Sequence, residues 1–390
     1  MTCAAARGRR ALAGFALLLT GATGWQAPVA EAATPLPVAC TTSVPFRSGT
    51  EGYHTFRIPA VVRVGEATVL AFAEGRRDSA ADDGDIDVVL RRSHDGGCTW
   101  EALQVIADAG TETFGNPAPV VDPRTGRVVL LICRDTGPER LVHELHSDSG
   151  GATWSPPRDI TSQVKPANWR WYATGPGHAI ALRHGPYAGR LLVPANHTAV
   201  LAGGTVHGAH ALYSDNGGQD WHIGFVQALP GDWLNLNEST MAELPDGRIY
   251  VNSRDDRGLS PATRADAHSP DGGLGITGVF RPQDALDGPE VQGSVLPTHD
   301  GALLYSGPAD PRGRKRMTLR VSRDGGASWT PEPPLSTLPA AYSDLVELGD
   351  GTVGLLYETG LTSPYESLAF TRLTQGPNGW IPTPATAPGR

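Results

Sequence analysis

The sequence predicts an all-β chain folded as a six-bladed β-propeller. Of its 390 residues, 48 are glycine and 33 are proline, and no stretch shows a sustained helical period. One eight-residue motif recurs along the chain, beginning at residues 93, 147, 214, 269 and 322. A repeating unit of roughly 50 residues built on hairpins has the size of one four-stranded propeller blade. Five marked blades and a sixth assembled from the two chain ends give the predicted six.

The recurring motif is a turn signature. Its first copy reads Ser-His-Asp-Gly-Gly-Cys-Thr-Trp over residues 93–100, and the copy at 269 is degenerate and has lost the tryptophan. Each copy lies between short apolar runs, so we expect it in a hairpin turn. There a carboxylate accepts backbone N–H donors, glycine allows a positive φ, and tryptophan packs on the sheet. We therefore interpret five aspartates as turn residues without a catalytic role: Asp95, Asp148, Asp215, Asp271 and Asp324.

The first 32 residues are typical of a secretory signal peptide. A basic segment, MTCAAARGRR, precedes the apolar run ALAGFALLL and a stretch of small residues. That run of about nine residues is shorter than the roughly 20 that a membrane helix needs. We expect cleavage near Ala32, secretion, and one propeller domain over residues 33–390 without a membrane anchor. The Arg9-Arg10 pair leaves a twin-arginine export route open.

The mature chain is expected to be acidic. Loss of residues 1–32 removes Arg7, Arg9, Arg10 and Glu31, which changes the net charge from −9 to −11. A protein of this charge is a poor candidate for nucleic-acid binding. An anionic ligand therefore has to be attracted by a local group of arginines.

Three cysteines remain after the signal peptide, namely Cys40, Cys98 and Cys133. They cannot all pair within one chain, and the sequence leaves their pairing open. There is no C-x-x-C and no His/Cys cluster at zinc spacing, so we expect no metal site.

The recurring motifs resemble the Asp boxes of the sialidase superfamily, and a second motif agrees with them. Residues 53–60, Tyr-His-Thr-Phe-Arg-Ile-Pro-Ala, resemble the F/Y-R-I-P motif of sialidases, whose arginine, here Arg57, holds the substrate carboxylate. Propellers bind ligands where loops from all blades converge, so the other site residues should be scattered through the chain outside the repeats. The resemblance runs from about residue 43 to residue 371.

An acidic stretch over residues 78–87 is the candidate source of the acid/base group. In the sialidases that its register resembles, the acid/base aspartate lies nine residues before the first arginine of a pair, here Arg91-Arg92, which selects Asp82. The adjacent Asp83 remains the alternative. The preceding segment, Ala-Phe-Ala-Glu-Gly-Arg, ends at Arg76, which we assign to substrate binding.

Two further segments resemble parts of the sialidase site that surround the substrate carboxylate. Glu238 precedes the Arg254 of Asn-Ser-Arg by 16 residues, a spacing that in the family supplies the general base and the second carboxylate-binding arginine. Residues 306–318 resemble S-G-P-A-x-P-x-x-R-x-N-x-T and favour Arg314 as the third arginine over Arg312 and Arg316. Arg316 stands where the family usually has asparagine.

The remaining site segments lie on either side of these. Ala-Tyr-Ser-Asp-Leu over residues 341–345 resembles the nucleophile segment of the family, which makes Tyr342 the nucleophile and Glu358 the carboxylate that orients Arg57. Asn116, in Gly-Asn-Pro-Ala-Pro, and the segment of residues 171–177 resemble loops of the substrate pocket.

Sialic acid chemistry requires these residue types. The anomeric carbon of a sialic acid carries a carboxylate, to which guanidinium groups donate paired hydrogen bonds. A neutral tyrosine approaches that carbon without the repulsion that a carboxylate nucleophile meets, and Glu238 takes its proton. Asp82 then protonates the leaving oxygen and later activates water, which gives retention. The scheme needs no metal or organic cofactor.

The resemblance implies an exo-α-sialidase that acts on sialylated glycans and works as a monomer. Hydrolysis of a related nonulosonic acid such as Kdn, and trans-sialylation, remain alternative activities. A non-catalytic sialic-acid-binding lectin would keep the boxes and lose the Tyr/Glu/Asp set, and an extracellular interaction scaffold would not explain the arginines. The sequence does not give the linkage preference.

Overall fold

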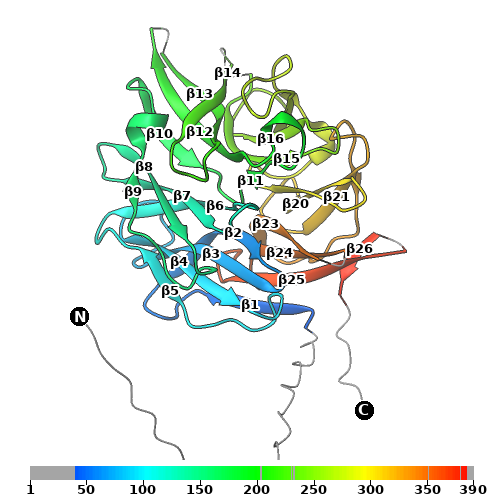
Figure 1. The fold of residues 1–390 in the computed structure, drawn as a ribbon. Helices are drawn as coiled ribbons and strands as arrows, with labels where there is room; N and C mark the ends of the chain where they lie inside the picture. The colour runs from blue at the N-terminus through cyan, green and yellow to red at the C-terminus, as the bar shows by residue number, and fades with distance from the viewer. Residues whose placement is uncertain are drawn as a thin grey trace, which may run out of the picture. The chain divides into compact units, whose positions relative to one another are not determined.

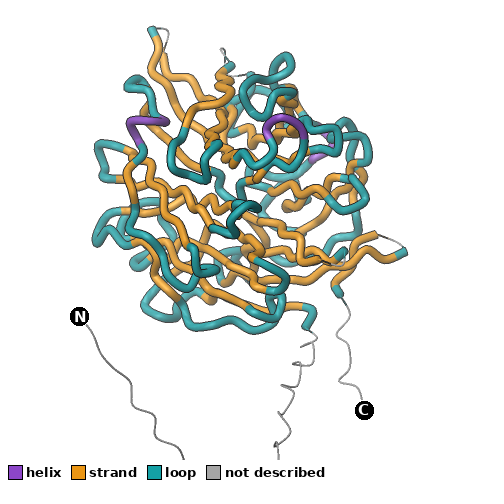
Figure 2. The backbone as a smooth tube through the Cα atoms, viewed as in Figure 1, coloured by secondary structure: helices purple, strands orange, loops and turns teal. Residues whose placement is uncertain are grey.

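Nearly all regular structure in the chain is β-strand. The computed structural model describes residues 40–202, 204–229, 231, 233–349, 351–377 and 379–383. Within these residues Figure 2 shows only short helical turns, which are α1 (Thr161–Val164), η1 (Gly185–Tyr187) and η2 (Asp284–Leu286). The predicted signal peptide, residues 1–32, lies outside the described residues, and its cleavage stays a prediction.

The first three blades follow one another along the chain as antiparallel meanders. Blade 1 consists of β2 (Thr55–Val64), β3 (Thr68–Arg76), β4 (Ile86–Ser93) and β5 (Gln104–Ala107). Blade 2 consists of β6 (Thr113–Val121), β7 (Val128–Asp135), β8 (Arg140–Ser147) and β9 (Arg158–Asp159). Blade 3 consists of β10 (Trp169–Thr174), β11 (Ile180–Ala181), β12 (Leu191–Leu201), β13 (Gly204–Ser214) and β14 (His222–Ala228). A single parallel pair, Ile86 with Thr113, joins the sheets of blades 1 and 2.

The other three blades complete the set. Blade 4 consists of β15 (Leu236–Glu243), β16 (Ile249–Asp255), β17 (Arg264–Ser269) and β18 (Arg281–Pro282). Blade 5 consists of β19 (Ser294–Pro297), β20 (Leu303–Pro308), β21 (Met317–Ser322) and β22 (Thr330–Pro331). Blade 6 consists of β23 (Ala340–Gly349), β24 (Thr352–Thr359), β25 (Ser367–Gly376), β26 (Gly379–Pro382) and, from the other end of the chain, β1 (Thr42–Arg47).

The blades close into a ring. Their innermost strands contact one another in turn: β2 lies against β6, β6 against β10 and β11, β12 against β15, β15 against β19, β19 against β23, and β23 against β2. Strand β1 adds to the outer side of blade 6, where Thr42 pairs with Thr371 and Arg47 with Ser367. Figure 1 shows this N-terminal strand beside the red strands of the C-terminus. The predicted six-bladed propeller, with one blade built from both chain ends, is confirmed.

Apolar side chains fill the gaps between neighbouring blades. Leu70 of blade 1 and Leu130 of blade 2 belong to one buried cluster, and five other clusters occupy the remaining gaps in the same way. Because a central strand is covered on both faces, its residues read as near-continuous apolar runs. A seventh, smaller cluster at one end of the axis contains Ile58, Val291, Ala341 and Tyr342.

The turn motif works as predicted at three of its five copies. In every copy the first serine accepts a hydrogen bond from the second glycine's N–H, at 2.8 Å for Ser93 and 3.0 Å for Ser269. The carboxylates of Asp95, Asp271 and Asp324 accept the N–H four residues later, at 2.8–2.9 Å. At Gly97 (φ 92°) an added Cβ would collide with the ring of Phe370, so the motif needs glycine there.

Asp148 and Asp215 lie in the turn, but the expectation that their carboxylates accept its backbone N–H groups was wrong. Counted from the serine, the turn position holds Ser149 in the second copy and Asn216 in the third, and these side chains accept the N–H four residues on, at 2.9 and 3.0 Å. Asp148 instead pairs with Arg127 at 2.7 Å, and Asp215 with Arg190 at 2.8 Å. A hydroxyl or an amide oxygen accepts the same N–H bond as a carboxylate, which is why the turn tolerates either.

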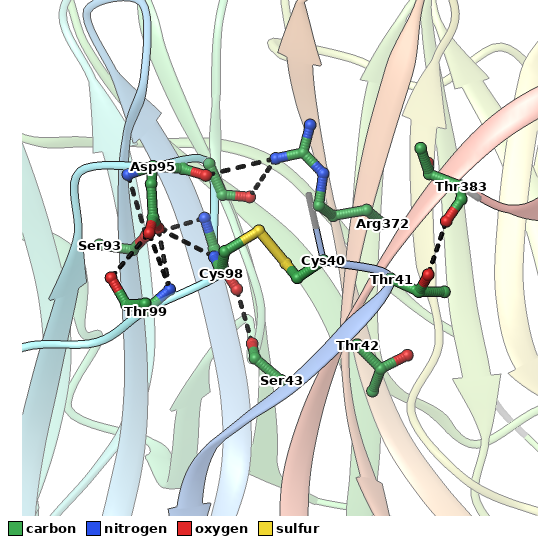
Figure 3. Close-up of a disulfide and its surroundings, with 12 residues drawn as sticks. Cys40, Thr41, Thr42, Ser43, Ser93, Asp95, Cys98, Thr99, Arg372 and Thr383 are labelled. Atoms are coloured by element: carbon green, nitrogen blue, oxygen red, sulfur yellow. Dashed lines mark hydrogen bonds between the residues drawn. A yellow bond between two sulfur atoms is a disulfide. The ribbon is translucent and has the colours of Figure 1, made fainter. Parts of the chain in front are cut away.

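A disulfide locks the closing strand to the first blade. Cys40, just before β1, is bonded to Cys98 in the first turn motif, and Cys133 is a free buried thiol. Figure 3 shows the surrounding contacts, in which the Ser43 hydroxyl donates to the Gly97 carbonyl at 2.6 Å. The strand that completes blade 6 is thereby held covalently to blade 1.

Among the described residues no helix is long and apolar enough to cross a bilayer.

We expect Cys40→Ser to lower the thermal stability of the propeller. The bond joins residues 58 apart, and removing such a cross-link releases the denatured chain, at a cost of about 2–4 kcal/mol in the free energy of unfolding. Calorimetry of the oxidised protein measures the change in Tm. Cys133→Ala, which removes a thiol outside the disulfide, is the control. An unchanged Tm for Cys40→Ser would show that the Cys40–Cys98 disulfide does not stabilise the propeller.

Candidate active site

The predicted site residues gather at one mouth of the ring because of strand direction. Arg57, Asn116, Glu238 and Tyr342 lie near the starts of the innermost strands β2, β6, β15 and β23. Arg254 and Glu358 lie near the ends of β16 and β24, the second strands of their blades. In an antiparallel pair the end of the second strand lies beside the start of the first. Both groups therefore face the same end of the axis.

Arg57 is held by a fully buried carboxylate. Its Nε donates to Glu358 Oε1 at 3.0 Å, and Glu358 also accepts the backbone N–H groups of Ile58 and Tyr342, each at 3.1 Å. Burial opposes the charge on Arg57, but Glu358 outweighs it, so the pKa of the guanidinium is raised. Glu358 thus fixes Arg57 and the backbone of Tyr342 together, as the sequence-based assignment requires of an orienting residue.

Tyr342 donates its hydroxyl proton to Glu238. The distance from Tyr342 Oη to Glu238 Oε1 is 2.5 Å, and Arg254 Nη1 lies 3.0 Å from Glu238 Oε2 and 3.3 Å from Tyr342 Oη. Burial first, and then the neighbouring Glu238 charge, raise the pKa of Tyr342 well above 10. The phenol is therefore neutral at physiological pH, and the Glu238 side chain accepts its proton in a hydrogen bond.

Three arginines surround the tyrosine. The guanidinium carbon of Arg57 lies 5.0 Å from the centre of the Tyr342 ring, and that of Arg314 lies 5.7 Å from it. Arg254 contacts the hydroxyl, as described above. Arg312, Arg314 and Arg316 all lie in the loop between β20 and β21, and Arg314 is the one that lies against Tyr342. The three guanidinium groups gather positive charge around a neutral hydroxyl, and paired guanidinium donors of this kind can bind an anion.

Asp82 lies at the open side of this arginine cluster. It belongs to the loop between β3 and β4, its side chain is 76% exposed, and its Oδ1 is 2.7 Å from Arg76 Nη1 and 3.3 Å from Arg57 Nη1. Partial desolvation raises the pKa of Asp82, but Arg76, Arg57 and Arg314 lower it by more, so the carboxylate is ionised in the free protein. Both adjacent aspartates are exposed, and Asp82 is the one that contacts Arg76 and Arg57.

Arg76 and Asn116 lie behind Asp82. Arg76 is 2% exposed, and its donors reach Glu74 at 2.6 Å and the Ala80 carbonyl at 2.6 Å as well as Asp82. Asn116 donates its N–H to Glu74 at 2.9 Å and is half-buried. The structure thus places Arg76 as a support for Asp82, and its predicted contact with substrate stays a prediction.

The predicted pocket segment 171–177 borders Asn116. The Arg140 guanidinium donates to Asn116 Oδ1 at 3.1 Å and stacks 3.7 Å from the ring centre of the exposed Trp171. A pocket of about 630 Å³ lies next to Arg140 and Trp171, and most of its lining comes from the segments 135–141 and 165–171.

Within the part of the chain that the structure describes, no group of three or more His, Cys, Asp or Glu residues could hold a metal ion.

Sequence reasoning missed two residues at this mouth. Tyr365 accepts a hydrogen bond from Arg314 Nη1 at 2.6 Å and lies with its ring 4.4 Å from the Arg57 guanidinium. Asp256 accepts one from Arg254 Nη2 at 2.8 Å. Asp256 lies two residues after the arginine of the Asn-Ser-Arg motif and could have been found by this spacing. Tyr365 lies on a loop between β24 and β25 that carries no motif.

Comparisons with known proteins identify the family of the chain. A family model described as a BNR repeat-like domain matches residues 67–355. The chain is 31% identical to a sialidase of Micromonospora viridifaciens over 93% of its own length, and spans 57% of that protein. It is 30% identical to an exo-alpha-sialidase of Aspergillus fumigatus over 79% of each chain, and 29% identical to Sialidase-2 of Mus musculus over 83% of this chain and 93% of the mouse protein.

Solved structures share the fold. An intramolecular trans-sialidase from Ruminococcus gnavus superposes with a TM-score of 0.74 at 19% identity, over 89% of this chain and 99% of that one. The Hadza microbial sialidase Hz136 superposes with a TM-score of 0.72 at 24% identity, over 85% of this chain and 68% of the other. With the repeats, the closed propeller and these relatives taken together, the chain belongs to the sialidase family.

Proposed function

We propose that the protein is a secreted exo-α-sialidase that removes terminal sialic acid from glycoconjugates with retention of configuration. One observation carries the proposal: a neutral tyrosine hydroxyl, Tyr342, contacts the carboxylate of Glu238 inside a cluster of three arginines. Sialic acids carry a carboxylate on the reacting carbon, and a cluster of three arginines fits that group. The sialidase relatives support the same substrate class.

The first half of the reaction follows from the contacts around Tyr342. Arg57, Arg254 and Arg314 bind the substrate carboxylate and bring the anomeric carbon to the tyrosine. As Tyr342 Oη bonds to that carbon, its proton passes to Glu238 Oε1, which already lies 2.5 Å away. The glycosidic bond breaks, and its oxygen takes a proton from Asp82.

The second half reverses these roles. Asp82 takes a proton from water, the resulting hydroxide attacks the anomeric carbon, and Tyr342 leaves as its oxygen recovers the proton from Glu238. Two displacements at one carbon give retention. Atoms and charge balance without a redox step.

Asp82 has to gain a proton before it can act as an acid. In the free protein Arg76, Arg57 and Arg314 hold its pKa low. A bound substrate carboxylate competes with Asp82 for the donors of Arg57, which are limited in number, and its negative charge offsets the effect of Arg314 on Asp82. Substrate binding therefore raises the pKa of Asp82 in the direction that acid catalysis needs.

Incubation of the protein with the α2,3 and α2,6 isomers of sialyllactose, followed by proton NMR, tests the proposal. We expect free sialic acid to appear first as the α anomer. Appearance of the β anomer first would exclude retention, and a sialylated acceptor or an anhydro sugar as the main product would indicate transfer instead of hydrolysis. Binding without any product would favour the lectin alternative.

Tyr342→Phe should fold normally and lose most of its turnover, roughly 100-fold or more, because the hydroxyl is lost while the packing volume is kept. The measurement is kcat on sialyllactose, with the Tm of both proteins. Tyr357→Phe, which removes the hydroxyl of a buried tyrosine in the cluster between blades 5 and 6, is the matched control. Normal turnover of Tyr342→Phe would rule out the nucleophile assignment.

Asp82→Ala should lower kcat/KM on sialyllactose by on the order of 10²–10⁴, with a clearly smaller loss on an aryl sialoside. A sugar hydroxyl needs a proton to leave, whereas a nitrophenolate leaves without one. Asp83→Ala is the matched control and should change both substrates alike and modestly. If the leaving-group dependence appears in Asp83→Ala instead, the acid is one residue further along the loop.

Tyr365→Phe should weaken binding of a carboxylate-bearing sialic acid analogue by about three- to tenfold, because Arg314 loses its hydrogen-bond acceptor while the ring on Arg57 remains. Inhibition constants measure the change. The same substitution in an Arg314→Lys background should have little further effect. Equal losses in both backgrounds would mean that Tyr365 does not act through Arg314.

A further inference from the structure

A buried carboxylate lies directly behind the nucleophile. Asp344 follows Tyr342 by two residues on β23 and is 1% exposed. It accepts the N–H of Val61 at 2.8 Å, the N–H of His178 at 2.8 Å and the hydroxyl of Ser294 at 2.8 Å, and it lies 2.7 Å from His178 Nδ1. One carboxylate therefore ties β23 of blade 6 to β2 of blade 1, to β19 of blade 5 and to the segment of residues 175–178 in blade 3.

The same segment also reaches the strand of the base. Ser239, the neighbour of Glu238 on β15, donates its N–H to the Gly175 carbonyl at 3.3 Å. The Gln292 amide donates to the Pro176 carbonyl at 3.2 Å and accepts the N–H of Ser343 at 3.0 Å. Residues 175–178 are thus bonded both next to the base and next to the nucleophile.

These bonds matter because the Tyr342–Glu238 contact spans two blades that are not neighbours. Glu238 belongs to blade 4 and Tyr342 to blade 6, and the innermost strand of blade 5, β19, contacts both of their strands. Packing between neighbouring blades sets the distance between Glu238 and Tyr342 only indirectly, because blade 5 lies between their two blades. Proton transfer requires that the two oxygens stay within hydrogen-bond distance, now 2.5 Å.

His178 gives the carboxylate a charged partner. The imidazole is 8% exposed; burial lowers its pKa, but the Asp344 charge and hydrogen bond raise it by more, which favours the cationic form of His178. Its Nε2 is buried and has no hydrogen-bond partner among the described residues. Away from Asp344 the histidine borders a cavity of about 520 Å³, whose other ionisable lining residues are Arg63, Arg183, His184, Glu243, His299 and Glu347.

We propose that Asp344 and His178 form a positioning pair that holds the Tyr342 hydroxyl against the Glu238 carboxylate. The pair touches neither substrate nor reacting atoms. It acts through the segment 175–178, which it bonds to β23 and which is bonded in turn to β15. The inference rests on the proposed role of Tyr342 as nucleophile. Loss of the pair should therefore slow the chemical step and leave the binding of substrate unchanged.

His178→Phe tests the pair, since it keeps ring volume and removes the side-chain donor. We expect kcat on an aryl sialoside to fall on the order of 10- to 100-fold, the cost of a misplacement of about 1 Å. The inhibition constant of 2-deoxy-2,3-didehydro-N-acetylneuraminic acid should stay within about twofold, because the arginines are untouched. His178→Gln, which keeps a donor for Asp344, should recover part of kcat.

The pH dependence gives a second readout. His178 pairs as a cation below its raised pKa, so the wild-type advantage over His178→Phe should be largest below pH 6.5 and narrow as the pH rises through the pKa of the folded protein. His143→Phe is the matched control, because it also removes a buried imidazole, from β8 in blade 2, and should leave kcat unchanged.

Three outcomes would overturn the proposal: a kcat of His178→Phe within twofold of wild type, a parallel loss of kcat and inhibitor affinity, or a kcat ratio that does not change with pH. Asp344→Asn should behave as His178→Phe does if it folds, and His178→Phe decides the question if it does not. Tyr342→Phe measured alongside separates the two proposals. If Tyr342→Phe is inactive and His178→Phe is normal, only the positioning role fails; if Tyr342→Phe is active, the nucleophile assignment fails.

Discussion

Closure of the ring is the constraint on which the rest of this structure depends. Arg57 and Glu358 are separated by 301 residues, and they form a buried ion pair only because the first blade lies against the last. That neighbourhood is secured by β1, which joins the sheet of blade 6 and is bonded through Cys40 and Cys98 to blade 1. A propeller that opened at this seam would separate Arg57 from the carboxylate that orients it.

The site concentrates positive charge within an acidic protein without leaving bare buried ions. Arg57 is balanced by Glu358, Arg254 by Glu238 and Asp256, and Arg76 by Glu74. Buried charges are costly unless paired, which explains these partners. Arg314 differs, because its guanidinium donates to the hydroxyl of Tyr365 and not to a carboxylate.

What the sequence could predict follows from the range of each interaction. The turn motif is local, so its spacing led to the blade count, and motif resemblance brought Arg57, Glu238, Arg254, Arg314 and Tyr342 into one set. The same reasoning misread Asp148 and Asp215, because it followed the residue type and ignored the distance from the serine. Tyr365, the Cys40–Cys98 pair and the contacts of His178 depend on segments that meet only in the folded ring, and no local pattern marks them.

The central contacts also explain why polar groups such as Ser343, Asp344 and Glu358 are buried beside Tyr342. A propeller core packs each blade against its neighbours, but it contains nothing that sets the distance between blades across the axis. Hydrogen bonds can set this distance because they weaken when their atoms shift slightly. Apolar packing cannot, because dispersion contacts tolerate such shifts. The carboxylates of Asp344 and Glu358 each accept backbone N–H groups from two segments. They thereby tie strands of different blades to one another by hydrogen bonds at the centre of the ring.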